Sequence, residues 1–331
     1  ALTQVSYRMA VEDAKDQIDN FKYRHYNYPV NQMFGSHTEV PSFLINMHLI
    51  TDLKDAEAYI SRLRKVDDLF AQLIEGLKIR EVAGIIPPRF VFPRSLESCK
   101  NIISGNPFSD TGEDSAILAD FKKKVTALDL EAPLKQRLIQ LATAALLDTV
   151  KPAYETLITF LEDQHQHAND DAGVWKFKDG ATFYNEKLRL TTTTKLTANE
   201  IHETGLTEVD RIHGEMRAIM KQVEFEGDLQ AFFAFMRTDE QFYYPNTDNG
   251  RDAYLAKAVA VIDDMRERLD SLFITQPKSE LIVKRVEAFR EKSAGTAFYQ
   301  PPAPDGSRPG TYYANLYNMM NMPKYQLEAL A

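Results

Sequence analysis

Histidines are the first side chains to test for chemistry, because two of them four residues apart on a helix, with a glutamate between, bind zinc and activate water. The chain has seven histidines, and none belongs to an HExxH motif. Glu203 follows His202, but no histidine stands four residues after His202. His165 and His167 are two residues apart and would point to different faces of a helix. The sequence therefore predicts neither a metal ligand nor a catalytic residue within this chain.

The segment 295–317 is the second candidate for chemistry, because it is dense in Tyr, Pro and Gly. Aromatic side chains on such a loop can form the wall of a binding site, and Arg308 could bind a carboxylate. A rigid surface loop that holds two helices together would have the same composition, so both interpretations stay open. The β-branched and aromatic run TYYANLY at 311–317 predicts a strand at the end of this loop.

Helices must position this segment, since helical periodicity dominates the chain. Thr197 and Glu200 form a capping box, in which each side chain satisfies a backbone N–H of the other residue, so a helix begins there. Two consecutive prolines, Pro87 and Pro88, separate an earlier pair of helices. The predicted helices cover residues 3–22, 53–79, 93–104, 115–128, 133–166, 182–190, 197–223, 227–236, 250–272, 279–291 and 325–331.

Two further segments lack this periodicity. Residues 26–42 are rich in Asn, Pro and Gly and are expected to form a loop. Residues 169–184 carry a turn signal between short aromatic runs, which predicts a small hairpin or an irregular segment. The loss of helical periodicity at residue 169 divides the chain into a helical region, 1–168, and a helical region with small β elements, 169–331, unless both form one continuous domain. The expected fold is mainly α: a multi-helix bundle with a small β-hairpin and a short edge strand near the C-terminus.

Composition narrows the class of protein further. The net charge of −9 argues against a nucleic-acid partner, which requires a basic surface. Cys99 is the single cysteine, so the sequence excludes an internal disulfide and a cysteine-based zinc site. No run of about 18 apolar residues exists, and no membrane span is expected. The polar start, ALTQVSYRM, indicates that a signal peptide is either lacking or removed.

Several longer motifs resemble one family. TTTTKLTANEIHETGLTEVDRIHGEM at 191–216, MRTDEQFYY at 236–244 and AFYQPPAPDGSRPGTYYANLYNM at 297–319 resemble hallmark segments of the bacterial family known as domain of unknown function 885. GIIPPRFV at 84–91 and DAEAYISRLRKV at 55–66 are similar to it as well. The resemblance covers nearly the whole chain, in order, which is more specific than one short pattern.

The resemblance implies a helical zinc metallopeptidase of the gluzincin type, similar to carboxypeptidase Taq. In that family the zinc motif H-E-x-x-P-G-H-H follows directly after a segment like PKYQLEALA, whereas this chain stops at Ala331. Zinc is therefore expected in the complete protein and not in this chain. The resemblance also implies that TYYANL is an edge strand that pairs with the substrate backbone. The substrate-binding residues expected from it are Tyr312, Tyr313 and Asn315, with Tyr299 and Arg308 as further candidates.

The expected function is that of the upstream part of a zinc-dependent peptidase acting on short peptides, inactive as this chain alone. One alternative is a non-catalytic helical envelope protein that binds a peptide or another ligand, and a third is a hydrolase of another class. Relatives of the resembled kind often carry export or lipoprotein signals, so the resemblance favours a periplasmic or lipid-anchored location over a cytoplasmic one. The oligomeric state stays open.

Overall fold

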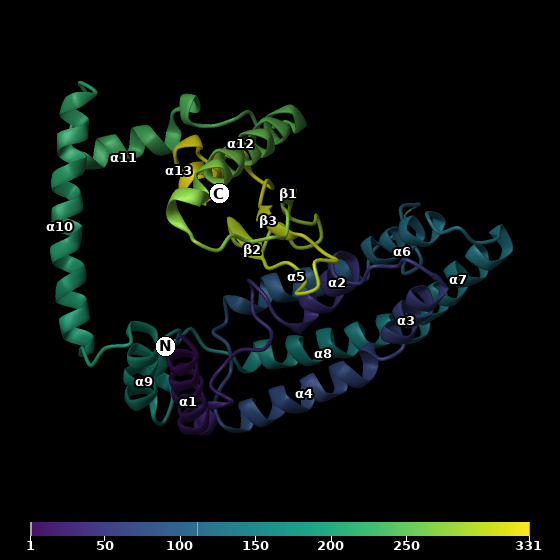
Figure 1. The fold of residues 1–331 in the computed structure, drawn as a ribbon. Coiled ribbons are helices and arrows are strands. Elements are labelled where there is room, and N and C mark those ends of the chain that lie inside the picture. Colours follow the sequence, from purple (N-terminus) through teal and green to yellow (C-terminus); the bar gives the residue numbers. More distant parts are fainter. Residues whose placement is uncertain (1, 111, 331) are drawn as a thin grey trace. The chain divides into compact units, whose positions relative to one another are not determined.

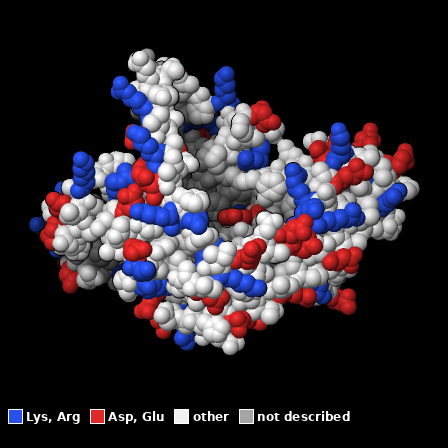
Figure 2. Space-filling model, turned by 90° about the horizontal axis from the view of Figure 1, so that it is seen from below, with Lys and Arg blue, Asp and Glu red and all other residues white. Residues whose placement is uncertain are grey.

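The structure is a computed structural model that describes residues 2–110 and 112–330, and of Leu2 only the backbone. The fold is mainly α with a small sheet near the C-terminus, as the periodicity predicts. Two compact units make up the chain: the first ends at Val209 and the second begins at Asp210. None of the described helices is both long and apolar enough to cross a membrane. Figure 2 shows acidic and basic side chains interspersed on the face that it draws.

The first unit is built from helices, most of which bury an apolar face. They are α1 (Leu2–Asn20), α2 (Ser36–Asn46), α3 (Leu53–Leu63), α4 (Val66–Val82), α5 (Val91–Ile102), α6 (Ala116–Thr126), α7 (Ala132–Ala145), α8 (Lys151–His167), α9 (Gly180–Thr192) and the first part of α10 (Ala198–Gln222). α4 and α8 lie side by side (Figure 1). Apolar residues three or four positions apart form their shared core. There the rings of Phe70 and Tyr154 meet edge to face, with centroids 4.8 Å apart.

Two helices occupy the stretch predicted as a single helix over 53–79, so that prediction is wrong in its continuity. α3 ends at Leu63, and Lys65 leaves helical geometry, with φ −116° and ψ 3°, before α4 starts at Val66. Both Leu63 and Val66 are buried. The chain therefore turns between two apolar residues that a straight helix would place close to one face.

Residues 26–42, predicted as a loop, contain the start of α2, which includes Pro41. A proline inside a helix leaves the carbonyl four residues earlier without its backbone donor. That carbonyl belongs to His37, and the Tyr154 hydroxyl donates a hydrogen bond to it at 2.6 Å. A residue distant in sequence thus satisfies the helix, which no local pattern indicates.

The long helix predicted over 133–166 is present but contains a wider turn. α7 continues into α8 through a π-helical turn at Leu146–Val150. At its end the Lys151 N–H bonds to the carbonyl of Leu146, five residues back. Pro152 follows directly and has no N–H to donate, so the hydrogen-bond ladder shifts by one residue just before it.

The segment 169–184 forms no hairpin and is irregular before α9, which is the second of its two predicted forms. A 3₁₀ turn at Val174–Lys176 leads directly into α9. The turn closes tightly at Gly180, where a Cβ atom would lie 2.0 Å from the carbonyl oxygen of Val174. Glycine is therefore required for the close approach of the two backbones. The Gly180 that was interpreted as part of a hairpin turn serves this approach and does not reverse a strand.

Aromatic contacts tie the α9 region to the first unit. The rings of Phe177 and Phe183 each pack against Tyr26, with centroids 5.1 Å apart. These contacts agree with a first unit that ends at Val209, inside α10.

The start of α10 has the predicted capping box. The backbone N–H of Thr197 donates to a carboxylate oxygen of Glu200 at 2.8 Å, and the Glu200 N–H donates to the Thr197 hydroxyl at 3.3 Å. The two side chains thus satisfy backbone donors that the first turn of a helix leaves free. This reciprocal pair confirms that the local sequence sets where the helix begins.

The second unit contains the rest of α10, then α11 (Leu229–Thr238), α12 (Asp248–Leu272) and α13 (Lys324–Leu330). Its strands β1 (Leu281–Arg285), β2 (Ala297–Gln300) and β3 (Gly310–Ala314) are arranged in the order β1-β3-β2. β1 runs parallel to β3, and β2 runs antiparallel to it. The helix predicted over 279–291 is therefore wrong, because the β-branched pair Ile282-Val283 favours a strand.

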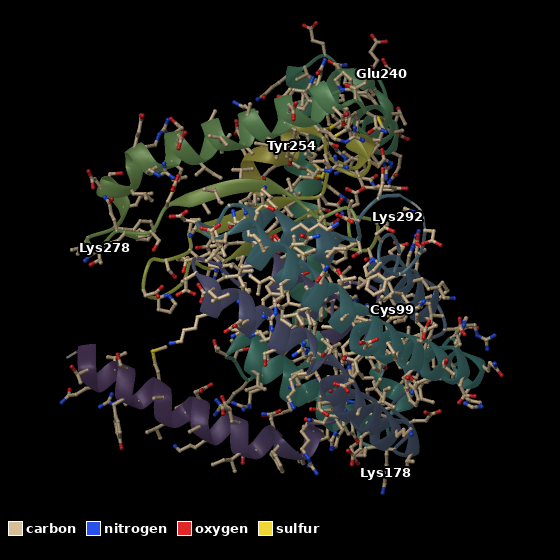
Figure 3. The ribbon with its side chains drawn as sticks, turned by 90° about the vertical axis from the view of Figure 1, so that its right-hand side faces the viewer. Cys99, Lys178, Glu240, Tyr254, Lys278 and Lys292 are labelled. Atoms are coloured by element: carbon tan, nitrogen blue, oxygen red, sulfur yellow. The ribbon has the colours of Figure 1, made fainter. Side chains whose placement is uncertain are left out.

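The strand predicted at 311–317 is confirmed as β3, but it is the central strand and not an edge. α12 covers one face of the sheet, where Tyr254 and Ala258 belong to the same core as Tyr312 and Ala314. Figure 3 shows Tyr254 in the interior of this unit. The strand that was expected to meet substrate is thus enclosed by its own sheet and by α12.

Candidate functional site

Two of the five predicted substrate-binding residues, Tyr312 and Tyr313, are buried on opposite faces of β3. Tyr312 lies in the core with Tyr254. The hydroxyls of Tyr312 and Tyr254 have no hydrogen-bond partner of standard geometry among the described residues. Burial raises the pKa of both side chains. Tyr312 therefore supports the core of the second unit, and a substrate would not reach it.

Tyr313 lies on the other face and belongs to an aromatic and charged cluster. Its ring stacks on Phe298 of β2, with centroids 4.9 Å apart and planes 18° apart. The guanidinium of Arg290 lies over both rings, 5.1 Å from Phe298 and 5.6 Å from Tyr313. Burial raises the pKa of Tyr313 to about 12, with a further contribution from Glu287. The Tyr313 hydroxyl therefore keeps its proton at neutral pH and is available as a hydrogen-bond donor.

Asn315 fastens the segment before β2 to the end of β3. Its side-chain amide nitrogen donates to the carbonyls of Glu291, at 2.6 Å, and Ala294, at 3.0 Å. Its side-chain oxygen accepts the Tyr317 N–H at 3.2 Å. These bonds use both N–H groups and one acceptor site of the amide, so the position of Asn315 is explained without a substrate.

Replacing Asn315 with leucine is expected to lower the free energy of unfolding of the second unit by about 2 kcal/mol. Two carbonyls would lose their donor in a half-buried place, and each such loss costs about 1–3 kcal/mol. Urea unfolding followed by circular dichroism measures the change. If instead stability stayed the same and peptide affinity fell, Asn315 would be a substrate-binding residue.

A small polar cavity of about 130 Å³ lies beside Asn315 at the end of β3. The side chains of Asn318 and Asn321 line it together with Thr296. A cavity of this size holds a few water molecules, which suits its polar lining. It is too small for a peptide, whose sites are several times larger.

Tyr299 and Arg308 are the predicted residues that a ligand can reach. Tyr299 stands opposite Tyr312 in the register of β2 and β3, and its side chain is 56% exposed. Arg308 is half-buried in the loop between these strands, which is closed by a hydrogen bond from the Ala303 N–H to the Arg308 carbonyl. The positive charge of Arg308 acts to lower the pKa of Tyr313, so its guanidinium lies within electrostatic reach of that hydroxyl.

The edges of the sheet decide where a peptide could pair with it. β3 is bonded to β1 on one side and to β2 on the other, so the expectation that β3 itself pairs with substrate is wrong. Within the described residues no segment pairs with the outer side of β2. An edge strand of this kind presents backbone N–H and C=O groups to an added strand.

Comparison with known proteins identifies the family of this chain and a similar solved structure. Residues 1–331 match a family described as bacterial protein of unknown function (DUF885). The chain belongs to the DUF885 family. The crystal structure of the putative lipoprotein from Colwellia psychrerythraea is 28% identical to this DUF885 chain, with a TM-score of 0.83. The match covers 92% of this chain and 51% of that one, so the chain spans about half the length of that structure. Among curated proteins no match was found.

The described residues of this DUF885 chain contain no group of three His, Cys, Asp or Glu side chains that could hold a metal ion. The zinc motif that the family resemblance implies would lie outside these residues, so none of them is assigned as a zinc ligand. Cys99 is fully buried, and burial raises its pKa to about 12. Its thiol is therefore not a nucleophile in the folded protein.

Sequence reasoning missed two ion pairs in and after β1 of this DUF885 chain, and one of them lies beside Tyr313. Arg290 pairs with Glu287 at 2.6 Å, and Arg285 pairs with Glu291 at 2.9 Å. These residues fell within the helix predicted over 279–291. The run Leu-Ile-Val-Lys-Arg-Val, with β-branched residues before the charges, was the signal that could have indicated a strand.

Proposed function

We propose that this DUF885 chain is the peptide-binding, upstream part of a zinc-dependent peptidase that acts on short peptides. The zinc motif would belong to polypeptide outside the chain, which alone would bind peptides without cleaving them. The proposal rests on one structural observation: no described segment pairs with the outer side of β2, beside the exposed Tyr299 and the half-buried Arg308.

The outer side of β2 is suited to short peptides of varied sequence. Backbone hydrogen bonds from an edge strand require an extended peptide and no particular side chains. Tyr299 would pack against a substrate side chain, since its large apolar surface is already exposed. The guanidinium of Arg308 would bind a carboxylate of the peptide, because it forms a salt bridge with no described acidic residue.

Peptide binding is tested by fluorescence anisotropy with a labelled short peptide, in the presence of a chelator so that metal plays no part. We expect Arg308→Gln to weaken binding of a peptide with a free C-terminal carboxylate about tenfold, the loss of one charge-assisted hydrogen bond. The same peptide with an amidated C-terminus is expected to bind both proteins equally. Equal weakening of both peptides would remove the carboxylate-binding role from Arg308.

Strand addition itself is tested with N-methylated peptides. In an extended strand only alternate residues direct their N–H groups to the neighbouring strand. Methylating one alternate set is therefore expected to weaken binding at least tenfold, and methylating the other set is expected to have little effect. Equal effects of both sets, or no binding of any peptide, would contradict the proposal that β2 is the binding edge.

The alternative function is a non-catalytic envelope protein that captures a peptide or another ligand. Zinc content and chelator-sensitive turnover in the complete protein would favour the peptidase, whereas binding without turnover would favour the alternative. An envelope location is part of both proposals and is supported by the description of the Colwellia protein as a lipoprotein. Fractionation of cells that produce the complete protein tests it.

A further inference from the structure

An apolar cavity of about 590 Å³ lies in the first unit between α2 and the junction of α3 and α4. Leu44 and Val66 are buried at its base, while Phe43 and Leu69 form accessible walls that are 41% and 44% exposed. A cavity of this volume and lining is typical of sites for small apolar ligands. All of its lining residues belong to the first unit, and none belongs to the sheet of the proposed peptide site.

Arg62 is held at the wall of this cavity by His48. The His48 Nε2–H donates to the carbonyl of Asp55 at 3.0 Å, which leaves Nδ1 as an acceptor for Arg62 Nη1. Burial lowers the pKa of His48, so the ring is neutral at neutral pH. The Arg62 guanidinium also lies over the ring of Phe43, 5.5 Å from its centroid. Two contacts therefore fix Arg62, and neither of them cancels its charge.

The charges around the cavity favour an anionic group. Arg62 makes no ion pair with a described carboxylate, and the carboxylate of Asp55 is bonded to Thr51 instead. The ionisable residues that line the cavity are Arg62 and Lys65, which are basic, and Glu39, which is acidic. Lys65 pairs with Asp68 at 3.0 Å on the exposed surface. A carboxylate would therefore find its strongest partner in the fixed guanidinium of Arg62.

We propose that this cavity binds a free fatty acid, with the acyl chain between Phe43, Leu44 and Leu69 and the carboxylate on Arg62. The apolar lining would hold the acyl chain, and the guanidinium of Arg62, which no described carboxylate neutralises, would bind the carboxylate of the fatty acid. The site is independent of the proposed peptidase function, because it shares no residue with the sheet.

The test compares dodecanoate, dodecanol and dodecylammonium by isothermal titration calorimetry, the two ions below their micellar concentrations and dodecanol below its solubility limit. Dodecanoate is expected to bind more tightly than dodecanol, and dodecylammonium more weakly. Arg62→Gln, which keeps a donor for His48, is expected to weaken dodecanoate about tenfold and to leave dodecanol unchanged. Leu69→Asp is expected to weaken both ligands, since it places a charge in the apolar wall.

Arg64→Gln is the matched control, because Arg64 is an exposed arginine in the same turn that does not line the cavity. It is expected to leave all three affinities unchanged, and circular dichroism melting confirms that each variant is folded. The proposal is overturned if dodecanoate does not bind the unaltered chain, or if Arg62→Gln and Arg64→Gln have the same effect. Equal affinity for dodecanoate and dodecanol would overturn the role of Arg62.

Discussion

Replacing Tyr312 with alanine is expected to lower the free energy of unfolding of the second unit by about 3–5 kcal/mol. Removal of a fully packed aromatic side chain loses its burial and leaves a cavity. Tyr312 is 4% exposed and shares its core with Tyr254, Ala258 and Leu316. Urea unfolding followed by circular dichroism measures this change, because the second unit contains helices whose signal is lost when it unfolds.

The matched substitution, Tyr312→Phe, separates packing from hydrogen bonding. The Tyr312 hydroxyl is buried beside that of Tyr254 without a hydrogen bond of standard geometry, so its removal is expected to be neutral or to stabilise the unit slightly. Peptide binding is also expected to be unchanged in this variant. If Tyr312→Phe abolished peptide binding while the unit stayed folded, Tyr312 would contact substrate, and the assignment of Tyr312 to the core would be wrong.

Acidification from pH 6.5 to pH 4 is expected to cost the first unit about 3 kcal/mol through His37 alone. His37 is buried, and burial lowers its pKa from 6.5 to about 4. Between these values the unfolded chain binds a proton that the native protein does not, so stability falls as the pH falls. The contribution is fully present above pH 6.5 and lost at about pH 4, and 1.36 kcal/mol for each pH unit gives the magnitude.

His37→Gln isolates this contribution, because glutamine keeps a polar side chain without a titrating group. Guanidinium unfolding of both proteins at pH 7, 5.5 and 4.5 measures the difference in slope. The unaltered protein is expected to lose more stability than the variant over this range. Parallel curves would mean that His37 titrates alike in the folded and unfolded protein, and that its environment is more polar than the described one.

Local patterns predicted most of the helices, because their signals lie within a few residues. The capping box of Thr197 and Glu200 marks the start of α10 where the sequence places it. Distant contacts decided the elements that were missed. α2 continues through Pro41 only because Tyr154 satisfies the His37 carbonyl from a helix more than a hundred residues away. No short stretch of the sequence contains both His37 and Tyr154, so local patterns could not predict this hydrogen bond.

The candidate site was predicted in composition but not in geometry. The aromatic strand at the end of the 295–317 segment exists, yet whether a strand is central or an edge depends on which strands join it. β1 was predicted as helix, so the second neighbour of β3 was not foreseen. This error turned the buried residues Tyr312 and Tyr313 into expected wall residues, whereas Tyr299 is exposed and Arg308 and Asn315 are half-buried.

The burial of Cys99 gives the chain a built-in reporter of opening. It is the single cysteine and belongs to α5 of the first unit, and its interior position is visible in Figure 3. A thiol reagent will modify it only when that unit opens, because the closed state both shields the sulfur and suppresses the thiolate. The labelling rate under native conditions thus measures how often the first unit opens, free of any signal from the unit that carries the sheet.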